Sequence, residues 1–238
     1  MINEKIRIEE IAAHDLAEKR FIQTCGFDLG KEKHQRMMRM GEKVREDGIG
    51  GIDIQALVSF YGPEHFAGGA VKVGDAVITC NYFAQIPPEA LEGIYFYMLT
   101  AGECLFSSEE NIMDFLYADI WGTNYVDAGI QVLTEQYIEE DMKARFPGRE
   151  VWLSEEFGPG YFGMPVIETK KFFSILDAPS IGVRVKESGL MIPQKTCAGL
   201  YLVYNRADIK AEPSCMKCLG NADGCQFCAI KAKMKEEA

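Results

Sequence analysis

Hydrophobic positions in the first third of the chain alternate between helical and strand-like spacing. Over residues 6–20, apolar side chains recur every three or four positions between charged ones, which predicts an amphipathic helix. Residues 31–47, rich in Lys, Glu, Arg and Met, predict a second helix that ends at Gly48. The apolar run 52–61 fits either a strand or a helix, whereas 71–83, with a Gly-Asp turn, predicts paired strands.

The rest of the chain continues this mixture of strands and helices. Residues 107–110, Ser-Ser-Glu-Glu, have the form of a helix start, with hydroxyl caps followed by acids that suit the helix dipole. Further predicted elements are a buried strand at 94–100, a helix in two pieces up to 146, a strand at 151–153, a helix at 166–176, and strands at 181–186 and 200–204. Because no regular β-α-β rhythm appears, the pattern predicts an α+β fold with a curved mixed or antiparallel sheet and flanking helices.

Charge and composition narrow the class of protein. The chain has 238 residues and a formal net charge of -11, with 36 acidic against 25 basic residues. This balance argues against binding to nucleic acid or to anionic lipid, both of which need Lys and Arg. No apolar run reaches the length of a membrane span, and the charged N-terminus does not resemble a signal peptide, so we expect a cytoplasmic protein.

Cysteine dominates the C-terminal end, where apolar periodicity disappears. We therefore predict one domain at 1–210 followed by a short metal-binding tail at 211–238. In a reducing compartment, two Cys-x-x-Cys pairs joined by a glycine-containing loop indicate a metal site more than disulfides. Four thiolates suit either tetrahedral zinc or an iron–sulfur cluster, and the spacing does not decide between them. The four predicted ligands are Cys215, Cys218, Cys225 and Cys228.

Two segments in the last third carry the remaining candidate chemistry. The first, 157–165, reads Phe-Gly-Pro-Gly-Tyr-Phe-Gly-Met-Pro, and its glycines around a fixed proline make a backbone that a ligand can approach closely. Tyr161 adds an aromatic face and a hydroxyl. The second segment places Glu187 and Ser188 at the end of a predicted strand, where loops often carry function.

Together these segments resemble the reactivation domain of cobalamin-dependent methionine synthase. The resemblance covers residues 150–205, and before them it is one of general layout. That family has Pro-Gly-Tyr with a proline four residues after the tyrosine, and then Glu-Ser followed by Met, Pro and a small-residue stretch ending in Gly. The matching positions here are Pro159, Gly160, Tyr161, Pro165, Glu187, Ser188, Met191, Pro193, Thr196, Ala198 and Gly199. The cofactor-binding residues that the resemblance implies are Gly158, Pro159, Gly160, Tyr161, Glu187, Ser188 and Met191.

The resemblance implies a domain that caps a corrinoid protein whose cobalt has become inactive. In the family, S-adenosylmethionine binds at the Pro-Gly-Tyr turn and methylates the cobalt once an electron has arrived. Here the family's arginine, three residues before the first proline, is replaced by Glu156, next to Glu155. An arginine grips the methionine carboxylate, whereas a glutamate repels it by roughly a few kcal/mol. We therefore expect S-adenosylmethionine not to bind in the family's manner.

The leading hypothesis is an accessory protein that reactivates a corrinoid-dependent methyl-transfer protein. Because that chemistry needs an electron, it favours an iron–sulfur cluster over zinc, and it implies a corrinoid-binding partner and an electron donor. One alternative is a non-redox module with structural zinc that binds cobalamin or a corrinoid protein. Another is an S-adenosylmethionine-dependent methyltransferase, although no glycine-rich nucleotide loop follows an early strand. The other cysteines, Cys25, Cys80, Cys104 and Cys197, are expected to be small core side chains and not nucleophiles.

Overall fold

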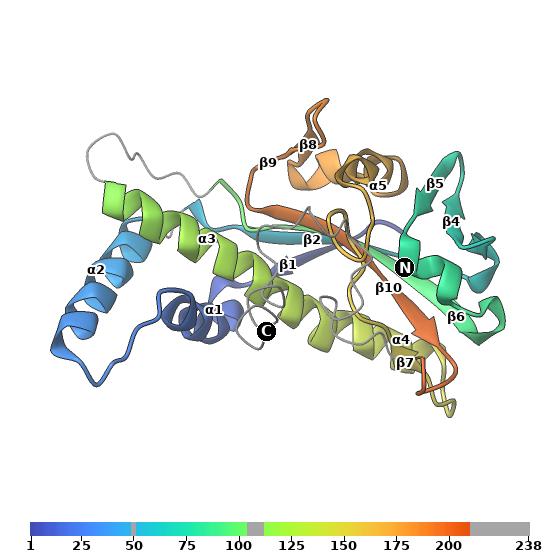
Figure 1. Cartoon of the computed structure of the whole chain (residues 1–238), viewed down its shortest axis with the longest axis horizontal. Coiled ribbons are helices and arrows are strands. Elements are labelled where there is room, and N and C mark those ends of the chain that lie inside the picture. Colours follow the sequence, from blue (N-terminus) through green and yellow to red (C-terminus); the bar gives the residue numbers. More distant parts are fainter. Residues whose placement is uncertain (49–50, 104–111, 210–238) are drawn as a thin grey trace, which may run out of the picture.

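A curved antiparallel sheet forms the centre of the molecule. The computed structural model describes residues 1–48, 51–103 and 112–209. Within these residues the main sheet has the strand order β1-β2-β6-β10-β7, and every neighbouring pair is antiparallel (Figure 1). Its strands are β1 (Glu4–Ile8), β2 (Ile54–Tyr61), β6 (Leu91–Thr100), β10 (Thr196–Tyr204) and β7 (Trp152–Leu153). The predicted α+β class with a curved sheet is confirmed.

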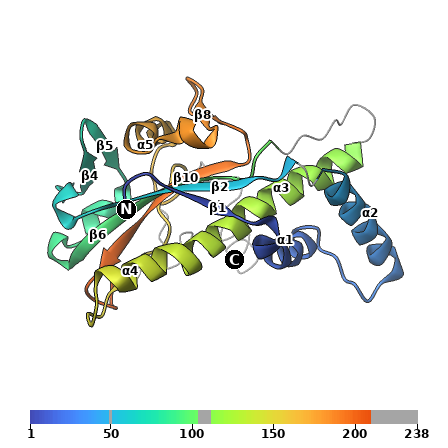
Figure 2. The same cartoon turned by 180° about the vertical axis from the view of Figure 1, so that it is seen from behind.

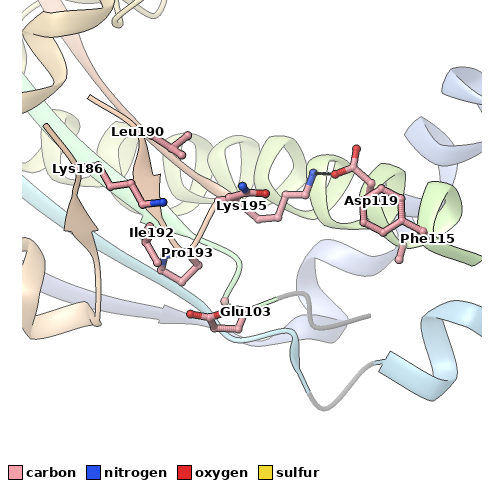
Figure 3. A pocket seen from close by; sticks show the side chains of 11 residues that line it. Glu103, Phe115, Asp119, Lys186, Leu190, Ile192, Pro193 and Lys195 are labelled. Atoms are coloured by element: carbon pink, nitrogen blue, oxygen red, sulfur yellow. Dashed lines mark hydrogen bonds and ion pairs between the residues drawn. The ribbon is translucent and has the colours of Figure 1, made fainter. Parts of the chain in front are cut away.

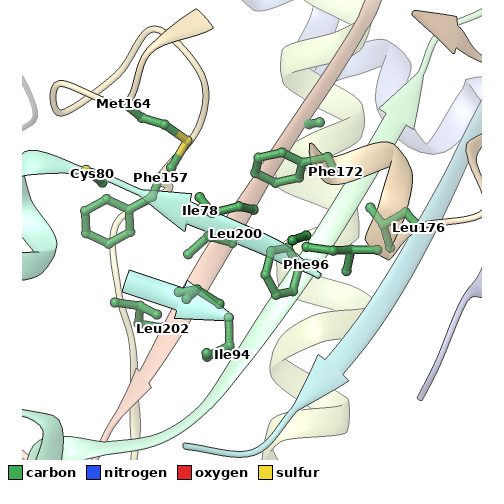
Figure 4. Packing of buried hydrophobic residues seen from close by; sticks show 14 of the residues in the cluster. Ile78, Cys80, Ile94, Phe96, Phe157, Met164, Phe172, Leu176, Leu200 and Leu202 are labelled. Atoms are coloured by element: carbon green, nitrogen blue, oxygen red, sulfur yellow. The ribbon is translucent and has the colours of Figure 1, made fainter. Parts of the chain in front are cut away.

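Alternating side chains of the central strands supply two separate cores. On β6, Phe96 and Met98 point to one face of the sheet, and Tyr95 and Tyr97 point to the other. This is the two-residue period of a strand that is covered on both sides. Figure 4 shows the first core, in which Phe96 packs with side chains of β10 and of the helix α5 (Thr169–Ile175).

Long helices cover the face that carries the tyrosines. The helix α3 crosses this face, and α1 and α2 pack against α3 (Figures 1 and 2). As predicted, the long helical stretch is interrupted, here by a π-helical turn at Thr134–Ile138. The helices are α1 (Glu10–Thr24), α2 (Glu32–Gly48), α3 (Ile112–Leu133) and α4 (Glu139–Arg145). No helix in the described part of the chain is both long and apolar enough to span a membrane.

Shorter elements cover the opposite face. A small antiparallel sheet and the helix α5 bury their apolar side chains against Phe96 and Leu200 of the main sheet. A hairpin, β8–β9, follows α5 and leads into β10. These strands and helix are β3 (Phe66–Ala67), β4 (Ala70–Val73), β5 (Ala76–Thr79), α5 (Thr169–Ile175), β8 (Arg184–Val185) and β9 (Met191–Ile192). Short 3-10 turns lie at Pro63–His65, Asn81–Gln85, Pro88–Ala90, Val166–Glu168 and Ala178–Ile181.

Two predicted elements differ from the structure for identifiable reasons. The helix expected from residue 6 begins only at Glu10, because Ile6 and Ile8 alternate with exposed Arg7 and pair with β2. The strand expected at 181–186 is reduced to Arg184–Val185, because the residues before it form a 3-10 turn that ends at Gly182 with φ of 75°. The proposed tail at 211–238 and the helix start at 107–110 lie outside the described residues.

Candidate functional site

The Pro-Gly-Tyr turn is fastened to the sheet at one point. Phe157 and Leu200 exchange two backbone hydrogen bonds of 2.9 and 2.7 Å, which fix the start of the turn against β10. Gly158 then passes so close to β10 that an added Cβ would lie 3.0 Å from the Ala198 carbonyl oxygen. Gly160 follows with a φ of 95°, a conformation that favours glycine, and the amide of Tyr161 donates to the Gly158 carbonyl at 2.9 Å. The glycines therefore shape the turn and hold Tyr161 beside the strand.

The second segment forms the turn of the β8–β9 hairpin and packs against the first. The Lys186 amide donates to the Leu190 carbonyl at 2.9 Å, and Gly189 turns the chain with a φ of 88°. A Cβ added at Gly189 would lie 3.3 Å from the carbonyl oxygen of Val166. Val166 directly follows Pro165, the last residue of the first segment. The two segments, separated by about two dozen residues in sequence, thus meet in space.

Both segments line one cavity of about 270 Å³, which we call the motif cavity. Pro159 and Tyr161 come from the turn, Met191 comes from the hairpin, and Thr196 and Ala198 come from β10. The cavity lies along the outer edge of β10. In the described part of the chain, β7 and Phe157 cover that edge only from Leu200 onward. Backbone groups at an uncovered strand edge are available to a ligand. The remaining lining residues are Glu156, Val166, Thr169, Gly189, Leu190, Gln194 and Cys197.

The predicted cofactor residues divide into those at the cavity and those beside it. Pro159, Tyr161 and Met191 line the motif cavity together. Gly158 and Gly160 are not among its lining residues and act on the path of the backbone. Glu187 and Ser188 are exposed at the tip of the hairpin, where the Ser188 hydroxyl accepts a 3.5 Å hydrogen bond from the Leu190 amide. Their role in binding a cofactor stays a prediction.

A half-buried carboxyl group sits at one end of the motif cavity. The hydroxyl of Tyr97, on β6, donates a hydrogen bond to Oε1 of Glu156. Burial raises the pKa of Glu156, Asp127 adds to the rise by charge repulsion, and the Tyr97 hydrogen bond opposes it. The Cys197 sulfur lies 4.0 Å from the Tyr97 hydroxyl oxygen, and burial holds the pKa of this thiol well above its ordinary value. Cys197 therefore stays a neutral thiol, which is a poor nucleophile.

Glu156 also borders a second cavity, of about 480 Å³, which we call the acidic cavity. It lies beside the π-helical turn, where the Thr134 hydroxyl donates to the Tyr201 hydroxyl at 3.1 Å. Asp127, on α3, lines this cavity, and partial burial raises the pKa of its carboxyl group. Arg20 donates to the side chain of Gln131 at 3.0 Å across the same cavity. Single π-helical turns inside α-helices often occur at functional sites.

A third cavity, of about 310 Å³, lies on the other side of the segment that joins β9 to β10. Leu190 and Gln194 line both this cavity and the motif cavity. Lys195 crosses it to Asp119 at 2.6 Å (Figure 3), and the same ammonium group donates to the Thr123 hydroxyl at 2.9 Å. Pro193, one of the residues that carry the family resemblance, lines this third cavity and not the motif cavity.

Sequence reasoning missed several residues of the site. Cys197 and Gln194 lie inside the segment that was singled out, between Pro193 and Ala198, so their position there was a usable signal. Asp127 and Tyr97 lie far away in sequence, and only the packing of α3 and β6 brings them to Glu156. Their periodicity is that of ordinary core and helix positions, so no pattern in the chain marks them.

The predicted metal site lies outside the described residues. Cys215, Cys218, Cys225 and Cys228 all fall in the undescribed range 210–238. Among the residues that the structure describes, no group of three or more His, Cys, Asp or Glu side chains is placed to hold a metal ion. The chemistry of the four-thiol donor set remains the sole support for a metal there.

Comparisons with known proteins indicate the fold. No protein-family model matches the chain, and no curated protein matches it. Among solved structures, the chain is similar to the crystal structure of the MetH reactivation domain bound to AdoHcy, with a TM-score of 0.60. The two sequences are 13% identical, and the match covers 89% of this chain and 80% of that chain. The chain therefore shares the fold of a methionine synthase reactivation domain.

Proposed function

We propose that this protein reactivates a corrinoid-dependent methyl-transfer protein by docking over its cobalt-bearing cofactor. The observation that carries the proposal is the motif cavity, because two segments chosen for their resemblance to the reactivation family line it together. The shared fold with a methionine synthase reactivation domain, which was solved with AdoHcy bound, also supports the proposed reactivation role. The partner in this proposal is a corrinoid-binding protein or methyltransferase.

An exposed apolar rim around the cavity supports docking. Four large apolar side chains at its mouth are between 44% and 57% exposed. Clusters of exposed apolar side chains often mark interaction sites. A flat macrocycle with its surrounding protein would cover such a rim and exclude water from the cavity. The apolar rim consists of Tyr161, Val166 and Leu190, which line the cavity, and of Ile167, which directly follows Val166 in the chain.

The proposal assigns electron delivery to the C-terminal tail. Its four cysteines have the donor set of an iron–sulfur cluster, and such a group, when bound, supplies single-electron transfer. One electron converts Co(II) to Co(I), the state that accepts a methyl group. Zinc at the same four thiolates would leave a module that binds the partner without reducing it.

Anaerobic mixing with a loaded corrinoid domain tests the proposal. The probe is the cobalamin domain of methionine synthase in its cob(II)alamin form, with titanium(III) citrate as the reductant. We expect a sub-stoichiometric amount of the full chain to accelerate the loss of the cob(II)alamin absorption, and Cys215→Ser with Cys218→Ser to abolish the acceleration. A spectral change without reduction would contradict the electron-transfer part and match the zinc-bearing module.

Two surface variants distinguish docking through the apolar rim from the general effect of an added surface charge. Leu190→Asp places a charge on the apolar rim, and we expect it to abolish the acceleration. Ile11→Asp, at a 73% exposed position on α1, serves as the matched control and should leave the rate unchanged. Equal rates for the two variants would overturn docking through this rim.

A further inference from the structure

The motif cavity carries charge of one sign. Glu156 is the one Asp or Glu among its described lining residues, and no Lys, Arg or His lines it. The two other titratable side chains, Tyr161 and Cys197, cannot carry a positive charge, and their raised pKa values keep both of them neutral. A ligand in this cavity therefore meets a negative or neutral wall and no cationic partner.

The acidic cavity extends this field beyond Glu156. Its lining adds Asp127, Glu135 and Glu139, and the single cation among its described lining residues is Arg20. The guanidinium of Arg20 donates to the neutral side chain of Gln131 at 3.0 Å, and its charge offsets part of that of Asp127, which leaves the carboxylates in excess. Clefts lined by one sign of charge attract ligands of the opposite sign. Both cavities that meet at Glu156 therefore favour a cation.

The uncharged walls suit an organic cation better than a hydrated metal ion. Tyr161 comes from the turn, Met191 places a thioether on the opposite segment, and Pro159 adds an apolar surface. Aromatic faces attract onium groups, and thioethers make polarizable contacts with apolar groups. Hard metal ions prefer several oxygen ligands, and this cavity offers one carboxylate.

We propose that the motif cavity selects an organic cation that lacks a carboxylate, with Glu156 as its counter-ion and Tyr161 and Met191 as its apolar walls. This inference rests on the proposed function and names the ligand class of the same site. Glu156 is then the residue that determines specificity. A carboxylate on the ligand would face Glu156 with no cation to compensate it, and like charges in a partly desolvated site repel strongly.

A matched pair of ligands isolates the effect of the carboxylate. S-adenosylmethionine and its decarboxylated form, S-adenosylmethioninamine, share the sulfonium and the nucleoside and differ only in that group. We expect calorimetry with the full chain to give at least tenfold tighter binding of the decarboxylated compound, a difference of about 1.4 kcal/mol. Equal affinities, tighter binding of S-adenosylmethionine, or no binding of the decarboxylated compound would each overturn the inference.

Two variants at the same position show whether Glu156 is responsible. Glu156→Gln keeps the size and a hydrogen-bond acceptor for Tyr97 but removes the charge, so the affinity ratio should fall to near one. Glu156→Arg should reverse the preference. If Glu156→Arg does not fold, as judged by circular dichroism, Glu156→Gln alone decides. An unchanged ratio in a folded Glu156→Gln variant would show that another residue sets the preference.

These measurements need no corrinoid, so the two proposals fail separately. Loss of the ligand preference with intact acceleration of cob(II)alamin reduction would overturn only the assignment of the ligand class. The reverse result, an intact preference without any effect on the cobalt, would overturn the proposed function and leave a cation-binding module.

Discussion

The two faces of β6 and β10 are built from the same strands but contain different chemistry. On the α5 face, Phe96 and Leu200 pack among apolar side chains. On the α3 face, the neighbouring positions are Tyr97 and Tyr201, whose rings stack at 5.6 Å between centroids and lead to Glu156. Both faces are packed cores, and the α3 face also places titratable groups next to two cavities.

The apolar side chain on one face and the hydrogen-bonding side chain on the other belong to adjacent residues of β6. Phe96 and Tyr97 are adjacent in sequence and both are fully buried. Because successive side chains on a strand point to opposite faces, the chain can vary Tyr97 without disturbing the apolar core on the α5 face. The comparison predicts that a substitution at Phe96, which lines neither cavity, costs stability alone, whereas a substitution at Tyr97 changes stability and ligand preference together.

Phe96→Ala should cause the largest loss of stability. The ring is fully buried and meets Phe172 edge-to-face at 5.7 Å between centroids. Removing a buried phenylalanine costs about 3–5 kcal/mol of unfolding free energy, which urea denaturation measures. Under conditions where the variant is folded, its preference between the two sulfonium ligands should equal that of the wild type. A loss below about 1 kcal/mol would show that the α5 face is not a packed core.

Gly199→Ala should disturb the α3 face through crowding. An added Cβ would lie 2.8 Å from the Tyr97 hydroxyl oxygen and 2.9 Å from the Phe157 carbonyl oxygen. Overpacking of this kind costs about 1–3 kcal/mol. Because the displaced group is the hydrogen-bond donor to Glu156, the ligand preference should change as well. A stable variant with an unaltered preference would mean that Tyr97 does not position Glu156.

Tyr97→Phe and Tyr204→Phe form a matched pair of buried tyrosines on opposite faces. The Tyr97 hydroxyl donates to Glu156, whereas the buried Tyr204 hydroxyl has no hydrogen-bond partner among the described residues. Tyr97→Phe leaves a desolvated carboxyl group without its donor, so it should cost about 1–2 kcal/mol. Tyr204→Phe should be neutral or stabilising. Thermal denaturation of both variants checks this, and equal losses would refute the distinction.

The smallest effect should be the pH dependence contributed by Glu156. Burial raises the pKa of Glu156 in the folded chain, so between its ordinary value of 4.5 and that raised pKa the folded state holds a proton that the unfolded state has released. Stability contributed by this group therefore falls as pH rises through that window and then levels off. Glu156→Gln removes the fall, so its stability relative to the wild type should increase with pH over the same interval. The titratable groups around Glu156 are Tyr97, Asp127, Tyr161, Cys197 and Tyr201.

Urea denaturation at a series of pH values checks this prediction. A stability difference between Glu156→Gln and the wild type that does not vary with pH would show that Glu156 has an unshifted pKa. A difference of opposite slope would mean that the folded state favours the ionised carboxylate, in conflict with the burial of the group.

The sequence predicted the class of fold and the segments of the site, because both depend on local patterns. A continuous apolar run identified the buried strand β6, turn and β-branched residues identified the Gly74–Asp75 hairpin, and glycine with proline identified the turn at Pro159. The sequence could not predict the residues that contact Glu156, because their placement depends on how α3 packs over the sheet. The same limit applied to β1, where two isoleucines next to a helix fit either period until pairing with β2 decided.

The central claim is that the turn and the hairpin form one cavity that faces a corrinoid. Paramagnetic broadening of amide signals tests it most directly, with the ¹⁵N-labelled chain and the cob(II)alamin-loaded domain of methionine synthase. We predict that amides of Tyr161 and Leu190 broaden together, while those of Ile11 on α1 and Met38 on α2 stay sharp. Broadening at only one of the two segments, or mainly on α1 and α2, would contradict the account.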